Sequence, residues 1–325
     1  MDCRPSAFAT PPFSLAHAPV RSGDRRLAGW RSNVGTAVAL DAPGGEPSID
    51  AAALVVLSWN VWVGRGRLSE VVGRLRDGEY RHLGADPELP LLVLLQEAFR
   101  TDGTVPERSN GWAPREIVTR LRPREDVVET AVRLGLGLRY APSMRNGPER
   151  SDRGNAILSS LPLADATALE LPFEYQRRVA VAAEVGIAGG SLRAVSAHLD
   201  PRGPVGHKWL GAAGRAVQTR HLLTALEDDT VVLGADLNLG RGRAEPAWRW
   251  LAEAGFHFGV PPTLPVWPHT YHALPRLVLD YILLRDRAGA VTGARVHRLD
   301  EDPADRGPTV FGSDHHPLLA RIDLR

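Results

Sequence analysis

The stretch Ala53-Leu54-Val55-Val56-Leu57-Ser58-Trp59-Asn60 decides the fold class, because it is a short apolar run that ends on a polar side chain. A run of this length between turn residues predicts a buried β-strand. The pattern returns in Val232-Leu233-Gly234-Ala235-Asp236-Leu237-Asn238, where a second buried run leads into an acid and an amide. No repeat of fixed period accompanies this internal echo, so the sequence does not predict a solenoid.

Helical and strand patterns follow each other outward from the first run. Apolar spacing predicts helices over 68–77, 126–134, 206–226 and 244–254, and strands over 91–95, 154–159, 179–186, 191–198, 231–233, 277–284 and 318–322. The segment 139–153 is rich in arginine, proline and glycine, and we interpret it as a long loop. Strands that alternate with helices early and then crowd together indicate sheets covered by helices rather than a pure βαβ array.

The first fifty residues differ in composition from the rest of the 325-residue chain. Residues 1–50 are rich in Pro, Gly, Ala and Arg and show no sustained period, so we expect a loosely ordered N-terminal extension before one domain over 51–325. Prolines 11, 12 and 19 interrupt every apolar stretch that could act as a signal peptide. The apolar run 89–95 is too short to span a bilayer. We therefore expect a cytoplasmic protein without a transmembrane segment.

Charge and cysteine content exclude several classes of protein. Cys3 is the only cysteine, so neither an intrachain disulfide nor a zinc site built from thiolates can form. Lys208 is the only lysine, and no Gly-Lys-Ser/Thr triplet of a phosphate-binding Walker loop exists. The net charge of +1 gives no overall field to hold a long polyanion. Arginines remain the cations for phosphate, and several flank the predicted strands: Arg139, Arg145, Arg150, Arg153, Arg177 and Arg178.

The most conspicuous polar side chains share one position, in or beside the end of an apolar run. They are Asn60, Gln96, Glu97, His198, Asp236, Asn238, Asp280, Asp314 and His315. If the strands are neighbours in sheets, these groups can converge on one rim, where buried charges need a partner or a metal ion. Carboxylates and amides without a thiolate suit Mg²⁺ or Mn²⁺ better than zinc.

Each of these residues also has a plainer interpretation. Asn60 alone is more often a turn residue, Asp236 and Asn238 can form an Asx turn, and His198 can be a core histidine. Asp280 is harder to explain in this way, because a carboxylate inside an apolar strand needs a partner. The segment 267–272 (Trp-Pro-His-Thr-Tyr-His) is either a substrate-side loop or an ordinary proline-bounded loop.

Taken in order, the motifs resemble those of the endonuclease/exonuclease/phosphatase superfamily over residues 51–325. The motifs are Trp59-Asn60, Gln96-Glu97, Gly154-Asn155-Ala156-Ile157-Leu158-Ser159, Ala197-His198-Leu199, Gly234-Ala235-Asp236-Leu237-Asn238, Leu279-Asp280-Tyr281-Ile282-Leu283 and Ser313-Asp314-His315-His316-Pro317-Leu318. The resemblance implies an α/β four-layer sandwich, with two mixed, mostly antiparallel β-sheets face to face and helices on the outside. The internal echo fits the two similar halves of that fold.

The resemblance also implies a metal site and a phosphate contact. Glu97 would be the principal ligand of a catalytic Mg²⁺, Asn60 would support the metal site, and Asp314 would lie beside the ion. Mn²⁺ can take the place of Mg²⁺. Asn155 is a candidate for contact with the substrate phosphate.

Five further residues match catalytic positions of the family. Asp236 would orient or deprotonate the attacking water, and Asn238 would help to place it. His315 would contact the scissile phosphate, and Asp280 would hold its ring. His198 would face the leaving group. Members of the family are described with either the aspartate or the histidine as base, and the sequence leaves both open.

Together these roles imply a monomeric, Mg²⁺-dependent phosphoesterase in which an activated water attacks a phosphodiester. A nuclease acting on DNA or RNA is the first expectation. A sphingomyelinase-like enzyme, which His198 supports and the missing signal peptide opposes, and an inositol or sugar phosphatase are the alternatives. A rival of another class is a non-catalytic scaffold with the same fold, in which some of the acids should be lost. None of them is missing here.

Overall fold

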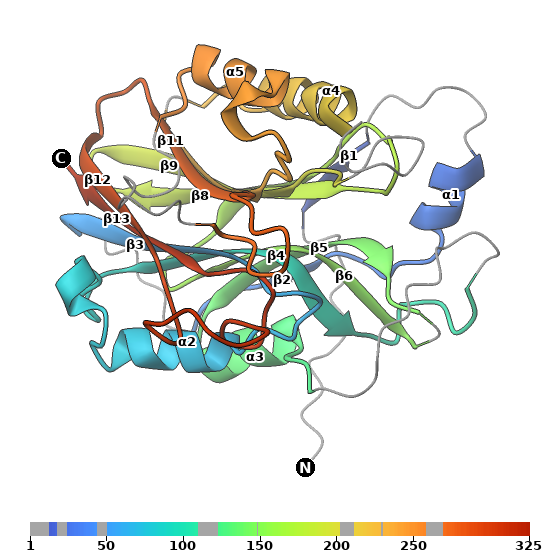
Figure 1. Ribbon diagram of the computed structural model, residues 1–325, viewed down its shortest axis with the longest axis horizontal. Coiled ribbons are helices and arrows are strands. Elements are labelled where there is room, and N and C mark those ends of the chain that lie inside the picture. Colours follow the sequence, from blue (N-terminus) through green and yellow to red (C-terminus); the bar gives the residue numbers. More distant parts are fainter. Residues whose placement is uncertain are drawn as a thin grey trace.

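The structure is a computed structural model that describes residues 13–17, 25–43, 51–109, 123–147, 149–201, 211–228, 230–257 and 269–325. Two β-sheets lie face to face, and helices cover the outer side of each sheet (Figure 1). Most strand pairs are antiparallel. The expected four-layer α/β sandwich is therefore confirmed.

The strands of the two sheets come from the whole length of the described chain. The seven-stranded sheet contains, in order, β12 (Val291–Arg298), β13 (Leu318–Leu324), β3 (Ala53–Asn60), β4 (Leu91–Thr101), β6 (Ser151–Ser159), β5 (Gly137–Arg145) and β2 (Val38–Leu40). The six-stranded sheet contains β1 (Ser14–Ala16), β7 (Ala164–Glu170), β8 (Val179–Ile187), β9 (Gly190–His198), β10 (Thr230–Asp236) and β11 (Asp280–Asp286).

Each sheet contains an inner parallel pair, its central pair, with an antiparallel strand on either side. The pair is β3 with β4 in one sheet and β9 with β10 in the other. Parallel strands end at the same edge of a sheet. The register accordingly sets Asn60 beside Gln96 and Asp236 beside His198. The echo in the sequence corresponds to β3 and β10, one strand from each central pair.

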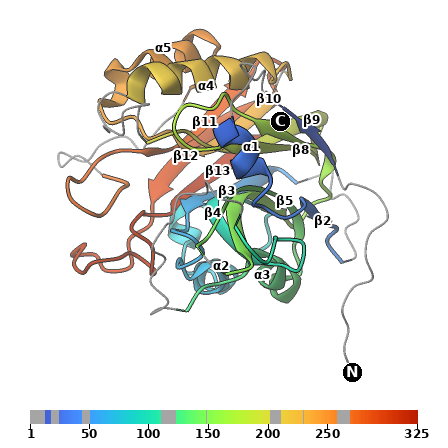
Figure 2. The same ribbon diagram turned by 90° about the vertical axis from the view of Figure 1, so that its right-hand side faces the viewer.

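Helices of the described part of the chain cover the outer face of each sheet, as two perpendicular views show (Figures 1 and 2). Helices α2 (Leu68–Arg76) and α3 (Val127–Leu134) cover the seven-stranded sheet, α4 (Ala212–Thr224) and α5 (Pro246–Glu253) cover the other, and α1 (Arg25–Arg31) lies near β5. Short 3₁₀ turns occupy Arg81–Leu83 and Gly242–Ala244.

Local chemistry accounts for some helix ends. The Asp126 side chain accepts hydrogen bonds from the backbone N–H of Val128 (2.9 Å) and Glu129 (3.3 Å), which caps α3 at its start. Gly135 ends the same helix with φ +64°, a conformation that costs glycine little. Pro246 opens α5, where its missing N–H does no harm.

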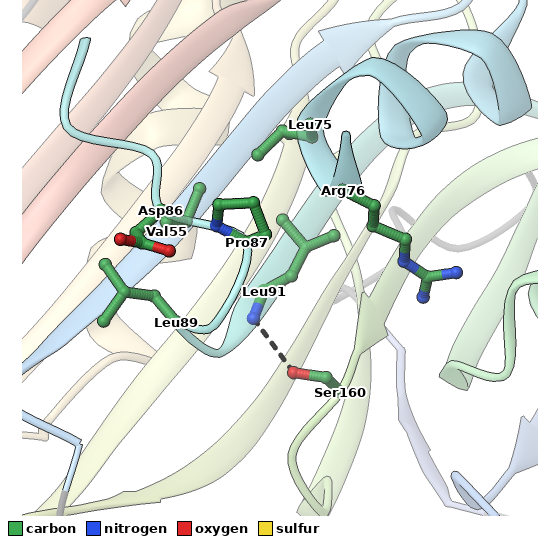
Figure 3. Close-up of a pocket in the computed structure, with 8 residues that line it drawn as sticks. All are labelled: Val55, Leu75, Arg76, Asp86, Pro87, Leu89, Leu91 and Ser160. Atoms are coloured by element: carbon green, nitrogen blue, oxygen red, sulfur yellow. Dashed lines mark hydrogen bonds between the residues drawn. The ribbon is translucent and has the colours of Figure 1, made fainter. Parts of the chain in front are cut away.

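At the amino-terminal ends of β3 and β4 the sandwich has a pocket of about 150 Å³ (Figure 3). Val55, Leu75, Leu89 and Leu91 line it, and the backbone N–H of Leu91 donates to Ser160 Oγ at 2.9 Å. The pocket is about 16 Å along β3 from Asn60, since strands rise about 3.3 Å per residue.

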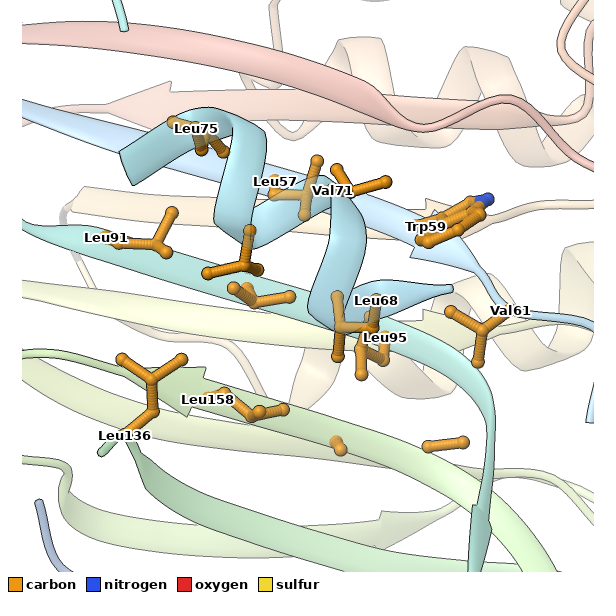
Figure 4. Close-up of a cluster of buried hydrophobic side chains, with 14 of the residues drawn as sticks. Leu57, Trp59, Val61, Leu68, Val71, Leu75, Leu91, Leu95, Leu136 and Leu158 are labelled. Atoms are coloured by element: carbon orange, nitrogen blue, oxygen red, sulfur yellow. The ribbon is translucent and has the colours of Figure 1, made fainter. Parts of the chain in front are cut away.

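Three apolar layers hold the sandwich together, one between the sheets and one under each pair of helices. In the layer beneath α2, Leu57 and Leu95 of the sheet pack against Leu68, Val71 and Leu75 of the helix (Figure 4). Each fully buried side chain of this size contributes about 1.5–3 kcal/mol relative to an exposed one. Every residue of β3 is buried because both faces of the strand are covered, which explains why its run is apolar almost throughout.

The two sheets approach closely near the carboxyl ends of the central strands. A Cβ atom added at Gly234 would lie 2.6 Å from Ser58 Oγ and 2.8 Å from Leu94 Cβ, so only glycine fits there. Gln96, fully buried, crosses the gap and donates from Nε2 to Gly234 O and to Ser196 Oγ, both at 3.2 Å. This amide bonds the sheets together at the end where the polar residues gather.

The expected long loop over 139–153 is wrong, because the segment forms most of the hairpin β5–β6. Arg139, Arg145 and Arg153 of this segment are buried, and Arg139 donates to Leu40 O at 2.8 Å. Strands β7 and β12 gave no clear apolar run because many of their side chains are only partly buried. The other predicted helices and strands are present, although α4 begins at 212 and residues 206–210 lie outside the described part.

Parts of the N-terminal extension join both sheets. β1 pairs with β7, and β2 pairs with β5. The Glu170 carboxylate is hydrogen-bonded to Arg31 of α1 and to Arg177 Nε at 2.7 Å. The division of the chain at residue 50 stays a prediction, since 1–12 (with Cys3), 18–24 and 44–50 are outside the described residues. Among the helices that the structure describes, none is long and apolar enough to cross a membrane.

Candidate active site

The polar residues singled out in the sequence meet at one edge of the sandwich. Asn60 ends β3, and His198 and Asp236 end the neighbouring strands β9 and β10. Asp280 begins β11 directly opposite Asp236 in the antiparallel register. His315 precedes β13, which pairs with β3. The site thus forms where the central strands of both sheets end together.

His315 is held by contacts on its ring and its backbone. Its Nδ1 lies 2.7 Å from Asp280 Oδ2, and Trp59 Nε1 donates to its carbonyl oxygen at 2.8 Å. Its backbone N–H donates to Ser313 Oγ at 3.1 Å. Asp280 is itself positioned, because its N–H donates to Thr270 Oγ1 at 2.9 Å. The ring of His315 is therefore oriented before any substrate arrives.

Charge favours the imidazolium form of His315. Burial alone would lower its pKa, but the Asp280 carboxylate, with smaller contributions from Asp236 and Asp314, raises the pKa to about 10. Nδ1–H then donates to Asp280, and Nε2–H faces Asp236 Oδ2 at 3.9 Å and Asp314 Oδ1 at 4.0 Å. A cationic donor points at the place where the acids gather.

Asp236 accepts several hydrogen bonds at the centre of the site. Its Oδ2 accepts from Asn60 Nδ2 at 2.9 Å and lies 3.2 Å from His198 Nε2, while its Oδ1 accepts from the N–H of Asn238 at 3.0 Å. Burial, and next the charge of Asp280, raise the pKa of Asp236 to about 7. A carboxyl group poised near neutral pH is suited to exchange protons with water.

His198 differs from His315 in its charge state. Its Nδ1 lies 3.0 Å from Arg178 Nη1, and a guanidinium can only donate, so Nδ1 must accept and the proton sits on Nε2. Burial, and then the charge of Arg178, lower the pKa of His198 well below its usual value. His198 is therefore a neutral imidazole whose N–H points toward Asp236.

Glu97 lies in a β-bulge. The register of β4 against β6 shifts between Leu95 and Ala98, and Glu97 has φ +54°, which is uncommon for a residue with a side chain. Such strain costs on the order of 1–3 kcal/mol and is concentrated at functional sites. The bulge lets Gln96 point between the sheets while the acid next to it takes another direction.

Glu97 and Asp314 form an acidic pair next to the His315 dyad. Burial raises the pKa of Asp314 to about 6 against the opposing charge of His315, and the charge of Glu97 adds to the rise. Ser313 Oγ donates to the carbonyl oxygen of Asn60 at 2.7 Å, so the Asp314 turn is bonded to the end of β3. Two carboxylates and an amide oxygen are ligands that fit a hard divalent cation.

Asn155 does not reach toward this cluster. Its Nδ2 donates to Val179 O at 3.0 Å and to Ser196 O at 3.3 Å, which uses both of its protons. A phosphate oxygen would need exactly those donors, so the structure gives Asn155 the role of a brace between the two sheets. We do not retain it as a phosphate contact.

The arginines expected to meet phosphate bond mainly to the protein itself. Arg145 donates to Gly147 O at 2.9 Å, Arg150 to Val105 O at 3.0 Å and Arg153 to Asn146 Oδ1 at 2.9 Å. Arg177 donates to Glu170 and to Pro142 O at 2.9 Å. These guanidinium groups bond to carbonyls, an amide and an acid of the fold, some of them only two to seven residues away along the chain. The sequence could not reveal these bonds because the folded backbone, and not the spacing of the residues, aims the groups at each other.

Sequence reasoning missed the neighbours that orient the predicted residues. Arg178, which sets the tautomer of His198, was noted only as one cation among several. Tyr271 lies with its ring centroid 5.0 Å from that of His315, so 269–272 borders the site as one of its two interpretations expected. Trp267 and Pro268 of that segment lie outside the described residues.

The Endonuclease/Exonuclease/phosphatase family matches residues 57–315, which is most of the chain, and the protein belongs to this family. The fold is that of a family whose members are mostly phosphoester hydrolases. No curated protein matches the chain by sequence.

Solved structures share the fold at low sequence identity. The catalytic domain of human Nocturnin with bound sulfate is 17% identical with a TM-score of 0.51, covering 89% of this chain and 97% of its own. A family protein from Leptotrichia buccalis is 14% identical (TM-score 0.52, 83% and 100% covered). The protein SmcL is 15% identical (TM-score 0.52, 83% and 99% covered). At such identities these neighbours establish the architecture alone.

Proposed function

We propose that the protein is a Mg²⁺-dependent phosphoesterase that cleaves a phosphodiester by direct attack of water. One observation carries the proposal. The buried Asp236 carboxylate lies between a neutral donor, His198, and a cationic donor, His315, with Glu97 and Asp314 beside them. A phosphodiester needs both a base for water and positive charge for its oxygens, and this edge supplies the groups for each.

Glu97 and Asp314, with the Asn60 side chain, would hold the cation. A bound Mg²⁺ supplies positive charge to a phosphate oxygen, which otherwise repels a nucleophile. Asn60 Oδ1 already accepts from the N–H of Trp62 at 3.0 Å and keeps one lone pair for a further contact. Because magnesium retains most of its waters, two or three protein oxygens are sufficient.

We assign the role of base to Asp236. Its pKa of about 7 leaves it able to take a proton from water at neutral pH. His315, with a pKa raised to about 10, is already protonated and acts as a donor to phosphate. Asn60 and His198 orient one oxygen of Asp236, and the N–H of Asn238 orients the other, so the carboxylate meets water in one geometry.

His198 would stabilise the leaving group by hydrogen bonding. Because Arg178 disfavours its imidazolium form, we infer that His198 donates its Nε2–H without transferring it. Asn238 adds a second donor on this side, since its Nδ2 has one proton engaged by Leu199 O at 3.0 Å and one left.

For the substrate we propose a nucleic acid, DNA or RNA, bound over a short footprint. The net charge of +1 gives no long-range field for a polyanion, and the arginines named above bond within the fold. A short footprint places only the scissile phosphate and its neighbours in the site. A sphingomyelin-like lipid or an inositol phosphate remains an alternative that a substrate panel separates.

Hydrolysis of bis(p-nitrophenyl) phosphate and nicking of plasmid DNA, each with and without Mg²⁺, test the proposal. We expect Glu97→Ala and His315→Ala to lower the rate about a hundred-fold or more, because each removes a charge that acts on the phosphate. Glu79→Ala and His82→Ala, two exposed residues of the same types, are the matched controls and should leave the rate unchanged. Activity that survives both site substitutions sinks the assignment.

The scaffold alternative makes a different forecast. A scaffold can still bind Mg²⁺ in calorimetry and lose that binding in Glu97→Gln. It does not hydrolyse any substrate of a panel that contains nucleic acid, sphingomyelin and inositol phosphate. Turnover of any one of these by the wild type, abolished in Glu97→Gln, excludes the scaffold and names the substrate class.

A further inference from the structure

A second group of metal-ligating side chains lies next to the catalytic edge and has no part in the proposed reaction. It consists of His269, His272, Asp305 and His316, whose ligand atoms all lie within 4.8 Å of one another. We propose that this group, the histidine cluster, binds one zinc ion, separate from the oxygen-rich Mg²⁺ site.

The distances match a tetrahedral site. Zinc bonds of about 2.0–2.1 Å place the ligand atoms of a tetrahedron about 3.3 Å apart. His272 Nδ1 lies 3.3 Å from His316 Nε2, and the two nitrogens lie 3.2 and 3.3 Å from Asp305 Oδ1. His269 Nε2 lies 3.1 Å from Asp305 Oδ2. Three side chains, His272, His316 and Asp305, therefore already place ligand atoms at the spacing that the ion requires.

Hydrogen bonds on the outer side fix the tautomers of two rings. His272 Nε2 lies 2.8 Å from Gly307 O, which can only accept, so Nε2 carries the proton. His316 Nδ1 lies 2.9 Å from Asp300 Oδ1 and 3.2 Å from Leu299 O, so Nδ1 carries the proton there. In the neutral rings, Nδ1 of His272 and Nε2 of His316 then both present lone pairs to each other and to a carboxylate. A cation between them removes that repulsion, and such outer partners are usual for zinc histidines.

Two buried atoms of the cluster lack hydrogen bonds among the described residues. They are His269 Nε2 and Asp305 Oδ1. Asp305 Oδ1 lies 3.2 and 3.3 Å from His272 Nδ1 and His316 Nε2, whose lone pairs cannot donate to it. His269 is only 8% exposed, His272 4% and His316 0%. A buried polar atom without a partner costs about 1–3 kcal/mol, which a metal bond would relieve.

Two arginines also contact the cluster, and both lie near the second carboxylate oxygen of Asp305, Oδ2. Arg276 Nη1 lies 3.3 Å and Arg298 Nη2 3.9 Å from Asp305 Oδ2. Arg298 Nη1 donates to the carbonyl oxygen of His269 at 2.8 Å and lies 3.5 Å from its Nδ1. Asp305 Oδ1, His272 Nδ1 and His316 Nε2 face no guanidinium in these contacts, so they form the core of the site. Because Arg298 Nη1 can only donate, His269 Nδ1 accepts and His269 Nε2 carries the proton, so His269 borders the ion without binding it.

The donor set selects the kind of ion. Two imidazoles and one carboxylate suit zinc, whereas Mg²⁺ prefers oxygen ligands with water. The chain can thus sort two metals, since the Glu97 and Asp314 site offers oxygen and the histidine cluster offers mainly nitrogen.

The position of the cluster suggests what its ion would do. The N–H of His272 donates to Asp314 O at 2.7 Å, and the N–H of His316 donates to Thr270 O at 2.8 Å. The cluster therefore joins the 269–272 segment to the turn that carries Asp314 and His315. Zinc would fix the position of the turn that carries Asp314 and His315, and it would not contact the substrate.

Zinc stoichiometry tests the proposal: metals are removed with a chelator, zinc is added back, and unbound zinc is dialysed away. We expect the wild type and Glu97→Gln each to bind one zinc per chain, measured by elemental analysis in the presence of a hundred-fold excess of Mg²⁺. Asp305→Asn and His272→Gln should lose that zinc, and the control His82→Gln should keep it. Zinc that is lost in Glu97→Gln but kept in Asp305→Asn overturns the proposal, because the ion then belongs to the other site. Absence of zinc in the wild type overturns it as well.

Two further readings keep the test decisive if a variant folds poorly. Co²⁺ added to the metal-free wild type should give the intense visible absorption of a tetrahedral ion, whereas a six-coordinate oxygen site gives only a weak one. Hydrogen exchange of the amides of 305–316 should slow when zinc is added to the wild type. A weak cobalt spectrum together with unchanged exchange contradicts the proposal, and neither result depends on a substituted protein.

Discussion

The two ends of the central strands differ in the kind of side chain that surrounds them. At the amino-terminal ends of β3 and β4, apolar side chains such as Val55, Leu75 and Leu91 surround a small pocket. At the carboxyl ends, the same strands lead to Asn60 and Glu97, among buried acids and histidines with displaced pKa values.

The comparison shows which end of the strands stabilises the folded protein and which end lowers its stability. Apolar burial at the first end and beneath the helices favours folding. At the second end the protein holds Asp236 and Asp314 in surroundings that disfavour their charge, and Glu97 in a left-handed backbone conformation. Such a site persists only because the rest of the fold determines it. Substitutions at the two ends should therefore separate activity from stability.

The largest expected effect is on activity at the carboxyl end. Asp236→Asn removes the proposed base, and we expect the rate of phosphodiester hydrolysis to fall about 10²–10⁴-fold. The folded-state pKa of Asp236 is raised to about 7, so its charge costs stability as pH rises from about 4 through 7. The variant should be at least as stable as the wild type at pH 8, as measured by thermal unfolding. A variant that is inactive and clearly less stable at pH 8 would contradict this account.

The next effect is on stability at the other end. Leu75→Ala leaves a cavity between α2 and the sheet beside the existing pocket, and should lower the free energy of unfolding by about 2–5 kcal/mol. Urea unfolding measures the loss, and the activity of the folded fraction should not change. Val132→Ala, an exposed position on α3 (68% exposed), is the control and should shift stability by less than about 0.5 kcal/mol. Loss of activity in folded Leu75→Ala would break the proposed separation.

The smallest effect concerns the metal and pH. Asp314, with its pKa raised to about 6, must lose a proton before it can bind Mg²⁺. We expect Mg²⁺ affinity to be constant above pH 7 and to fall about tenfold for each pH unit below 6, which is about 1.4 kcal/mol per unit. Calorimetric titrations at pH 5, 6, 7 and 8 measure this, with proton release near pH 6. Equal affinity at pH 5 and pH 8 would show that Asp314 is not a ligand.

Sequence patterns predicted the helices that bury one face and the strands that are buried on both faces. The apolar run of β3 and the spacing of α2 are local properties of the chain, and both elements are present within a residue of the expected bounds. The sequence did not predict the hairpin β5–β6, because a segment rich in arginine has the composition of an exposed loop. The carbonyl groups that accept from the buried arginines are known only from the structure. Among the site residues, placing Asn60, His198 and Asp236 at strand ends was enough to expect their convergence.

By itself the sequence determined the family, the order of its motifs and the residue types of the active edge, because these depend on local pattern and on side-chain chemistry. Only the tertiary structure decided the charge states. Asp280 makes His315 cationic and Arg178 keeps His198 neutral, although each histidine lies at one end of an apolar run in the sequence. The histidine cluster likewise exists only in space, since Asp305 is separated in sequence from His272 and from His316. Distances and electric fields between remote residues are set by packing, and packing is not a local property of the chain.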